Sequence, residues 1–318
     1  MTAKANKFLV INPGSGNGRS RQLADHYRKL LLANEQNVDS AETTELSDAA
    51  FLTKQAISSG YKTIVAIGGD GTISQVINGF MTSPQMESPP VLAVLYSGTS
   101  PDFCRFHGLA TNPQDAVNQL LIGRSRPIDI GRIRSTNVEG KAETSYFGCS
   151  ANIGLGAGIA SRANRLRKYL GDKAGTFLAT IATIAACPGH RFRLRLDDEV
   201  LDLPQVINIT VGKNPFLAGG LKLSIDIAPD DGSLFVFALT GIGRIGLLSA
   251  IHQIYSGSIA GDPRFLLRRA KRVGLETIDS AVQSEQDGDP AGWCPVEIEI
   301  VPRAIELLGV SDAGTSDH

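Results

Sequence analysis

Residues 63–80 are the part of the sequence that most limits which fold the chain can adopt. Residues 63–67 are β-branched or apolar and predict a buried strand. Apolar residues at helical spacing then predict a helix: Ile73, Val76, Ile77 and Phe80. Between them lies the turn Gly68-Gly69-Asp70-Gly71-Thr72, whose three glycines let a ligand approach the backbone. Because a helix start offers unpaired N–H groups and the positive end of the helix dipole, this unit is a candidate phosphate site.

The charge of Asp70 narrows what this turn can bind. A carboxylate and a phosphate repel each other, so Asp70 is expected to act through a cation or by orienting the hydrogen bonds of the loop. A nucleotide bound together with a metal ion satisfies both conditions. Taken alone, Gly-Gly-Asp-Gly is equally typical of an ordinary turn in a doubly wound sheet.

Other predicted strands also end in polar loops. The run at 8–11 leads into Asn12-Pro13-Gly14-Ser15-Gly16, and the run at 91–95 leads into the loop 97–103. Thr43 and Thr44 precede a further helix, although capping and turn formation are commoner roles for threonine. Because ligands of open parallel sheets bind beyond the carboxyl ends of the strands, these loops are expected to converge on one crevice.

Three familiar motifs are excluded. No P-loop sequence occurs in the chain, and Pro13 takes the place of the first glycine that a nucleophile elbow around Ser15 requires. The run 154–159 resembles a dinucleotide fingerprint, but its sixth residue is Ile159 and it lies outside a βαβ pattern, so we interpret it as a turn.

Composition limits the partners and the setting. The formal net charge of −1 gives no reason to expect nucleic acid. The four cysteines lie far apart and form no C-x-x-C pair, which indicates neither a zinc site nor a disulfide framework and favours the cytoplasm. No run of apolar residues approaches the ~20 that span a bilayer, so we expect the protein to contact a membrane only at its surface. The sequence leaves the oligomeric state open, a homodimer included.

The pattern of apolar and polar residues along the chain changes near Arg126. Up to that point the pattern predicts a doubly wound α/β domain, and from Pro127 onward strands that mostly alternate apolar and polar residues predict a β-rich domain. Two helical stretches, 163–186 and 242–256, interrupt these strands. The apolar segment 304–310 is expected to return to the first domain, giving domains of 1–126 plus 303–318 and of 127–302.

Taken together, the motifs resemble the diacylglycerol kinase catalytic-domain family, in particular its bacterial soluble lipid kinases. They occur in order from the first strand to the last: Asn12-Pro13-x-Ser15-Gly16, Gly68-Gly69-Asp70-Gly71-Thr72, Gly98-Thr99-x-x-Asp102-Phe103, Asp129-Ile130-Gly131, Asp231-Gly232 and Asp287-Gly288-Asp289. The resemblance implies an N-terminal α/β domain related to NAD kinase and phosphofructokinase, followed by a β-sandwich domain. It also implies ATP-dependent transfer of phosphate to a lipid hydroxyl, with diacylglycerol as the expected substrate.

The resemblance also implies a set of site residues. ATP would be bound by Asn12, Ser15, Thr43, Gly68, Gly69, Asp70, Gly71, Thr72, Ser74 and Thr99. An acidic network around a catalytic Mg²⁺ would comprise Asp70, Asp102 and Asp129. A separate structural Mg²⁺ would take the side chain of Asp231 and the carbonyls of Ala228 and Ser233. Asp289, or Asp287 beside it, would be the catalytic base.

Two departures from the family pattern keep other functions open. Pro101 stands where the family has asparagine, and Asp289 stands where it has glutamate, which shortens the reach of the base by about 1 Å. A catalytically weak lipid-binding or regulatory module is therefore one alternative. A kinase of a soluble substrate, of the NAD kinase type, is the other, because that class shares Gly-Gly-Asp-Gly.

A lipid substrate requires contact with a membrane surface. Basic residues lie next to apolar ones in two segments, 162–169 and 264–272, within a nearly neutral chain. Such segments attract anionic lipids at about 1 kcal/mol per charge, although a run of charges is more often only a solvated face. We therefore expect peripheral association with the inner face of the membrane.

Overall fold

The computed structural model describes residues 5–45, 47–154, 189–217, 221–240, 253, 262–279 and 281–310. The chain divides into two compact units. The first comprises Met1–Ile130, Phe216–Gly220 and Pro302–His318, and the second comprises Gly131–Pro215 and Leu221–Val301. The helices expected at 163–186 and 242–256 and the turn at 155–159 lie outside the described residues, apart from Gln253.

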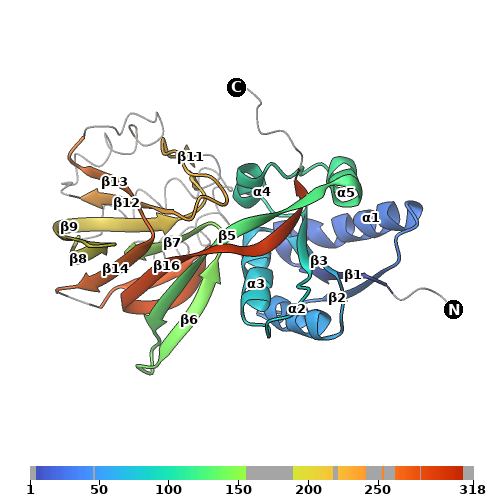
Figure 1. Ribbon diagram of the computed structural model, residues 1–318, viewed down its shortest axis with the longest axis horizontal. Helices are drawn as coiled ribbons and strands as arrows, with labels where there is room; N and C mark the ends of the chain where they lie inside the picture. The colour runs from blue at the N-terminus through green and yellow to red at the C-terminus, as the bar shows by residue number, and fades with distance from the viewer. Residues whose placement is uncertain are drawn as a thin grey trace. The chain divides into compact units, whose positions relative to one another are not determined.

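The first unit is built on a parallel sheet with the strand order β2-β1-β3-β4-β16 (Figure 1). Its strands are β1 (Lys7–Ile11), β2 (Val38–Glu42), β3 (Thr63–Gly68), β4 (Val91–Tyr96) and the last residues of β16 (Asp289–Val310). Its helices are α1 (Arg19–Ala33), α2 (Asp48–Ser58), α3 (Asp70–Met81), α4 (Asp102–His107) and α5 (Pro113–Ile122), with a 3-10 turn at Ser15–Gly18. The expected doubly wound α/β architecture is confirmed.

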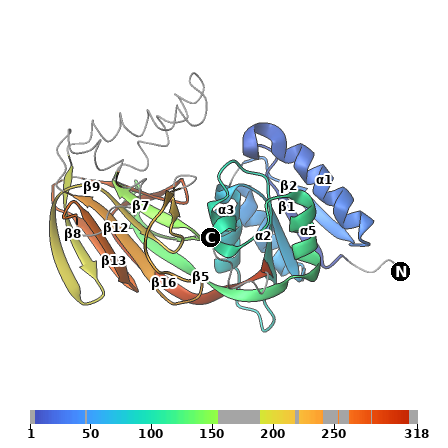
Figure 2. The ribbon, with the colours of Figure 1, turned by 90° about the horizontal axis from the view of Figure 1, so that it is seen from above.

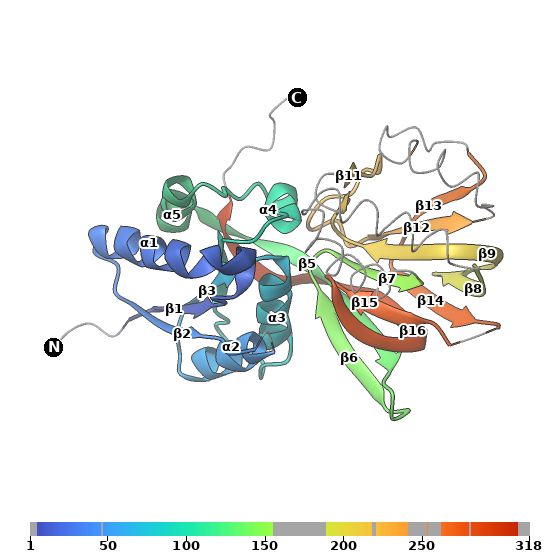
Figure 3. The ribbon, with the colours of Figure 1, turned by 180° about the vertical axis from the view of Figure 1, so that it is seen from behind.

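Alternate residues of the strands pack against helices on opposite faces of this sheet. On one face the core joins strand residues with α1 and α5: Leu9, Ile11, Val65, Ile67, Ala93, Leu95, Tyr27, Leu31, Val117 and Leu120. Figures 1 and 3 show α1 and α5 on this side of the strands and α2 and α3 on the other. Every residue of β3 is buried, as the continuous apolar run at 63–67 predicts for a strand covered on both faces.

The second unit consists of antiparallel strands around a separate apolar core. These are β6 (Ala142–Phe147), β7 (Ser150–Gly154), β8 (His190–Leu196), β9 (Glu199–Gly212), β12 (Leu234–Thr240), β13 (Phe265–Ala270), β14 (Arg272–Thr277) and β15 (Gln283–Gln286), with the last residues of β5 (Arg124–Thr136) and most of β16. The ladder runs β13-β12-β9-β7-β15-β16, and β8 links β9 to β14. Figure 2 shows β8, β9, β12 and β13 side by side.

The structure differs from the sequence prediction at three places. The expected domain boundary at 126/127 falls inside β5, because this strand continues from one unit into the other. The single strand expected at 145–153 is two strands, since the backbone turns at Gly148 and Cys149. Strands β13, β14 and β15 were not predicted. Within the described part of the chain, no helix is both long and apolar enough to cross a membrane.

Candidate active site

Three loops meet at the carboxyl edge of the first unit's sheet. The backbone N–H of Ser97, after β4, donates to the carbonyl of Gly68 at the end of β3 over 2.9 Å. The side-chain amide of Asn12, after β1, donates to the hydroxyl of Thr72 at the start of α3, also over 2.9 Å. The neighbouring parallel strands β1, β3 and β4 therefore bring the loops together, as their positions in the sequence predict.

The glycines of these loops allow the backbones to approach closely. A Cβ atom added to Gly98 would lie 2.6 Å from both the Cα of Gly69 and the hydroxyl of Tyr96. A Cβ added to Gly16, which has a φ of +60°, would lie 2.4 Å from the carbonyl oxygen of Ser97. Side chains at these positions would push the loops apart, so the glycines are required by packing as well as by any ligand.

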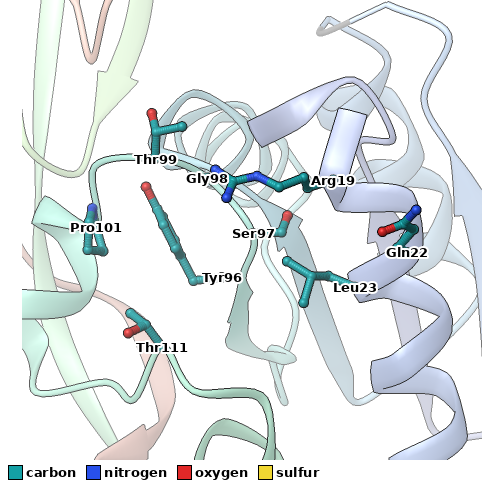
Figure 4. A pocket seen from close by; sticks show the side chains of 9 residues that line it. All are labelled: Arg19, Gln22, Leu23, Tyr96, Ser97, Gly98, Thr99, Pro101 and Thr111. Carbon is teal, nitrogen blue, oxygen red and sulfur yellow. The ribbon is translucent and has the colours of Figure 1, made fainter. Parts of the chain in front are cut away.

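A cavity of about 550 Å³ adjoins these loops in the first unit, a volume within the usual range for small-molecule sites. Its lining is shown in Figure 4: Arg19, Gln22, Leu23, Tyr96, Ser97, Gly98, Thr99, Pro101 and Thr111. The guanidinium of Arg19 extends toward Gly98, and the hydroxyl of Tyr96 points toward Thr99. Burial, and then the charge of Asp70, raises the pKa of Tyr96, so its hydroxyl stays protonated. The cavity thus offers a cation and a hydroxyl donor to an anionic ligand.

Gly98, Thr99 and Pro101 of this lining were singled out from the sequence. Arg19, Gln22, Tyr96 and Thr111 were missed. Arg19 carried a usable signal, since it directly follows the loop 12–18 and opens α1.

Asp70 and Asp102 lie next to each other at the start of α3 and α4. The backbone N–H of Asp102 donates to the carboxylate of Asp70 over 3.3 Å. The Asp102 carboxylate also receives the guanidinium of Arg105 at 3.0 Å and the hydroxyl of Ser100 at 3.3 Å. Magnesium is commonly held by one or two carboxylates together with substrate phosphates, so this pair fits a nucleotide-bound Mg²⁺.

The third expected acid, Asp129, is engaged by a backbone hydrogen bond. The carboxylate of Asp129 is buried and accepts the backbone N–H of Arg303 over 2.9 Å. Across the described residues, no three His, Cys, Asp or Glu side chains gather as a metal site. Three hydroxyl-bearing residues of the expected ATP set, Thr43, Thr72 and Ser74, are buried, with exposed fractions of 5%, 2% and 1%. Ser74 belongs to the packed side of α3 rather than to the loop surface.

In the second unit, Asp287 and Gly288 form the two-residue turn between β15 and β16. Gln286 pairs with Asp289 across this hairpin, and both turn residues have positive φ, at +46° and +92°. The Asp287 carboxylate accepts three backbone N–H groups, those of Gly148, Cys149 and Ser150, over 2.9–3.0 Å. These bonds explain why the backbone turns between β6 and β7. Asp287 thus fastens two turns to each other, whereas Asp289 is half-buried at the start of β16.

A polar row that the sequence analysis missed crosses three strands beside this hairpin. Asn152 pairs with both Glu285 and Thr210 in the sheet. Its amide donates to the carboxyl of Glu285 over 3.0 Å, and its oxygen accepts the hydroxyl of Thr210 over 2.6 Å. Burial raises the pKa of Glu285 to about 7, the hydrogen bond from Asn152 opposes this, and the charges of Asp287 and Asp289 add to the rise.

The residues expected to hold a structural magnesium do lie together, but they do not fit the metal. Asp231 accepts the backbone N–H groups of Ala228 and Ser233, each over 3.0 Å. The ammonium of Lys213, which is fully buried, lies 2.5 Å from Asp231 Oδ1 and 3.1 Å from the carbonyl oxygen of Ser233. Two of the three expected metal ligands therefore already bind a cation of the chain itself. Burial alone would raise the pKa of Asp231, but these hydrogen bonds outweigh it and lower the pKa.

The architecture of the first unit, with its loops converging on a carboxylate pair, is that of a nucleotide-using phosphotransferase. Comparisons with known proteins identify the family of phosphotransferases. The diacylglycerol kinase catalytic domain matches residues 6–133. The YegS C-terminal NAD kinase beta sandwich-like domain matches residues 149–309. The chain therefore belongs to the diacylglycerol kinase catalytic-domain family, and it is an ATP-dependent lipid kinase.

Similar proteins cover nearly the whole chain. A diacylglycerol kinase of Mycobacterium tuberculosis is 28% identical over 302 residues, which span 94% of this chain and 93% of that one. A diacylglycerol kinase of Staphylococcus epidermidis is 25% identical over 311 residues, which span 96% of this chain and 92% of that one. The crystal structure of a diacylglycerol kinase from Bacillus anthracis has a TM-score of 0.72 at 20% identity over 99% and 100% of the two chains. Yeast NADH kinase complexed with NADH has a TM-score of 0.56 at 11% identity, over 100% of this chain and 90% of that one. At this identity the comparison shows a similar fold.

Proposed function

We propose that this lipid kinase phosphorylates diacylglycerol. The γ-phosphoryl group of ATP passes to the free hydroxyl of the lipid, giving phosphatidic acid and ADP, and the hydroxyl proton passes to a carboxylate of the enzyme. The observation that carries the proposal is the match to relatives named diacylglycerol kinase along nearly the entire chain. The neighbouring carboxylates of Asp70 and Asp102 supply the chemistry that such a transfer needs.

The nucleotide is assigned to the loops of the first unit and the adjoining cavity. Backbone N–H groups at the start of α3 face the phosphates, and Arg19 and the protonated hydroxyl of Tyr96 add donors from the cavity wall. Asp70 and Asp102 would hold Mg²⁺, which when bound neutralises charge on the transferred group. In this kind of transfer the protein contributes mainly positioning and electrostatic stabilisation.

Asp289 is assigned as the base that takes the hydroxyl proton. The sequence left Asp287 and Asp289 as alternatives. The three backbone N–H bonds to Asp287 tie its carboxylate to the turn between β6 and β7, which favours a structural role. Asp289 is therefore the better candidate of the two.

The first test is the transfer of labelled γ-phosphate from ATP, with Mg²⁺ present, to a panel of lipids in mixed micelles. We expect label in diacylglycerol, with phosphatidylglycerol, a sphingoid base and NAD as the comparison acceptors. Label mainly in another lipid would keep the lipid kinase and replace the substrate. Label in NAD alone, or ATP binding without transfer to any acceptor, would contradict the proposal.

Membrane contact is assigned to the exposed basic residues on β13 and β14. Arg264 and Arg269 of the segment 264–272 are paired within the protein, with Asp262 and Asp231 respectively. The other exposed basic residues of the segment are Arg268, Lys271 and Arg272. The other basic segment, 162–169, lies outside the described residues. At about 1 kcal/mol per charge, three such residues support peripheral binding to anionic lipid.

Reversing these three charges should release the protein from anionic vesicles. We expect the triple variant Arg268→Glu, Lys271→Glu, Arg272→Glu to float with phosphatidylglycerol vesicles about 100-fold more weakly than the wild type. The matched control reverses three exposed lysines of the first unit, Lys29, Lys54 and Lys62, and should float as the wild type does. Equal flotation of the wild type and the first variant would refute this surface as the membrane contact.

A further inference from the structure

The position of the Lys213 ammonium follows from the pairing of β9 with β12. Gly212, the last residue of β9, pairs with Phe235 in β12. The next residue, Lys213, thus lies across from the start of β12, where the turn 228–233 ends. Its backbone N–H donates to the carbonyl of Cys149 over 2.9 Å, which fixes the base of the side chain. The side chain is 0% exposed, so its charge is held entirely inside the protein.

The ammonium binds two of the oxygens that a divalent cation would need. Its Nζ atom lies 2.5 Å from Asp231 Oδ1 and 3.1 Å from the Ser233 carbonyl oxygen. Magnesium binds oxygen at about 2.0–2.1 Å, so a metal ion on the same two oxygens would overlap the ammonium. The two cations would also repel each other at a distance where protein interiors screen charge poorly.

A second cation completes the neutralisation of the carboxylate. The guanidinium of Arg269, on β13, lies 2.8 Å from Asp231 Oδ2 and also donates to the Asp226 carbonyl over 2.8 Å. Asp231 Oδ1 and Oδ2 additionally accept the N–H groups of Ser233 and Ala228. Both carboxylate oxygens are therefore engaged by the chain's own donors, and two of these donors are cationic.

We propose that Lys213 is a built-in replacement for a structural metal ion, which makes the turn 226–233 independent of divalent cations. A buried charge is tolerated when it is paired and hydrogen-bonded, and Lys213 meets this condition through Asp231 and Ser233. Lys213 is thus a positioning residue: it holds the turn that leads into β12, the strand between β13 and β9 in the second unit. This assignment does not rest on the identity of the lipid or on the chemistry at Asp70.

The test measures thermal unfolding in EDTA and in MgCl₂, without nucleotide or lipid. The parent protein for all variants is Asp70→Asn, because this substitution weakens Mg²⁺ binding at the nucleotide site. We expect the parent protein to unfold at the same temperature in both solutions, and to retain no bound metal after EDTA treatment. Lys213→Ala, which removes the ammonium and leaves space, should unfold about 6–12 °C lower in EDTA. Added Mg²⁺ should recover part of that loss in a saturable way.

Two further variants make the result specific. Lys213→Met removes the charge but fills the space, so it should be destabilised without recovery by Mg²⁺. Lys141→Ala, which changes an exposed lysine of the same unit, should behave as the parent does. A saturable rise in the parent's unfolding temperature with Mg²⁺, or tightly bound metal in the parent after purification, would overturn the proposal. If Lys213→Ala does not fold, these measurements on the parent still decide the question. None of these readouts depends on kinase activity.

Discussion

Asp70→Asn is expected to lower the kcat for phosphate transfer by about 10³-fold while the protein remains folded. Asp70 opens α3 directly after the glycine turn, beside Asp102. An asparagine there has nearly the same shape, and its amide oxygen can still accept the backbone N–H of Asp102. It carries no charge, however, and cannot balance a magnesium ion on the transferred phosphoryl group. The loss should therefore fall on the reaction and not on stability.

The measurement pairs the lipid-labelling assay with thermal unfolding of the same preparation. The matched control is Asp25→Asn, which removes an exposed carboxylate on α1 that lies 3.6 Å from Arg28. Exposed ion pairs contribute about 0–1 kcal/mol, so this variant should keep both its activity and its unfolding temperature. If Asp70→Asn retained more than a tenth of the wild-type kcat, Asp70 could not hold the role that its place at the helix start suggests.

The sequence predicted the first unit well because its strands are covered on both faces. The apolar runs that became β1, β3 and β4 carry no competing polar signal, and the helices after β1 and β3 show helical spacing. Convergence of their loops followed from the rule for parallel sheets. The grouping of Asp70 with Asp102 came from the family resemblance. Asp129 could not be placed by the rule for parallel sheets, because its backbone partner Arg303 lies far along the chain.

The strands of the second unit were harder to predict from the sequence, because several of their buried residues are polar. Strand β15 has the sequence Gln-Ser-Glu-Gln, yet Ser284, Glu285 and Gln286 are all buried. They are buried because β7 and β16 pair with this strand on its two edges, which no local pattern reveals. Strand β13 ends in two arginines and a buried alanine, a run that resembles a basic surface segment more than a strand. In both cases tertiary pairing outweighs local propensity.

Lys213 shows the same limit at a single residue. A lysine directly after an apolar strand is ordinarily a solvated end, and nothing nearby in the sequence indicates burial. Only the pairing of β9 with β12 brings it to Asp231. The family pattern therefore predicted the oxygens of this site correctly as neighbours, but not the cation between them.

Glu285→Gln is expected to remove a large part of the pH dependence of the second unit's stability. The pKa of the buried carboxyl is about 7, against an ordinary value of 4.5, so the folded state binds the proton more tightly than the unfolded state does. The neutral side chain therefore fits the fold fully at low pH, and stability is lost as the pH rises from about 4.5 through 7. Between pH 5 and 8 this loss is about 2–3 kcal/mol.

The substitution keeps the local contacts while removing the charge. The amide oxygen of glutamine can still accept the hydrogen bond from Asn152, which the Glu285 carboxyl accepts over 3.0 Å. The difference in free energy of unfolding between the variant and the wild type should accordingly grow by about 2–3 kcal/mol, in favour of the variant, from pH 5 to pH 8. Because the two units can unfold separately, the signal must come from the second one. The chain's single tryptophan, Trp293, pairs with Gln283 beside this strand, so its fluorescence during urea unfolding reports the right unit.

The matched control for this prediction is Glu276→Gln, an exposed carboxyl on β14 of the same unit. It removes one carboxyl from the same unit without touching a buried side chain, so the change in stability between pH 5 and pH 8 should be that of the wild type. Parallel pH curves for wild type and Glu285→Gln would mean that the ionised carboxyl is accommodated in the row with Asn152 and Thr210. A diverging pair of curves would locate the pH sensitivity of the second unit in one buried side chain, beside the hairpin that carries Asp287 and Asp289.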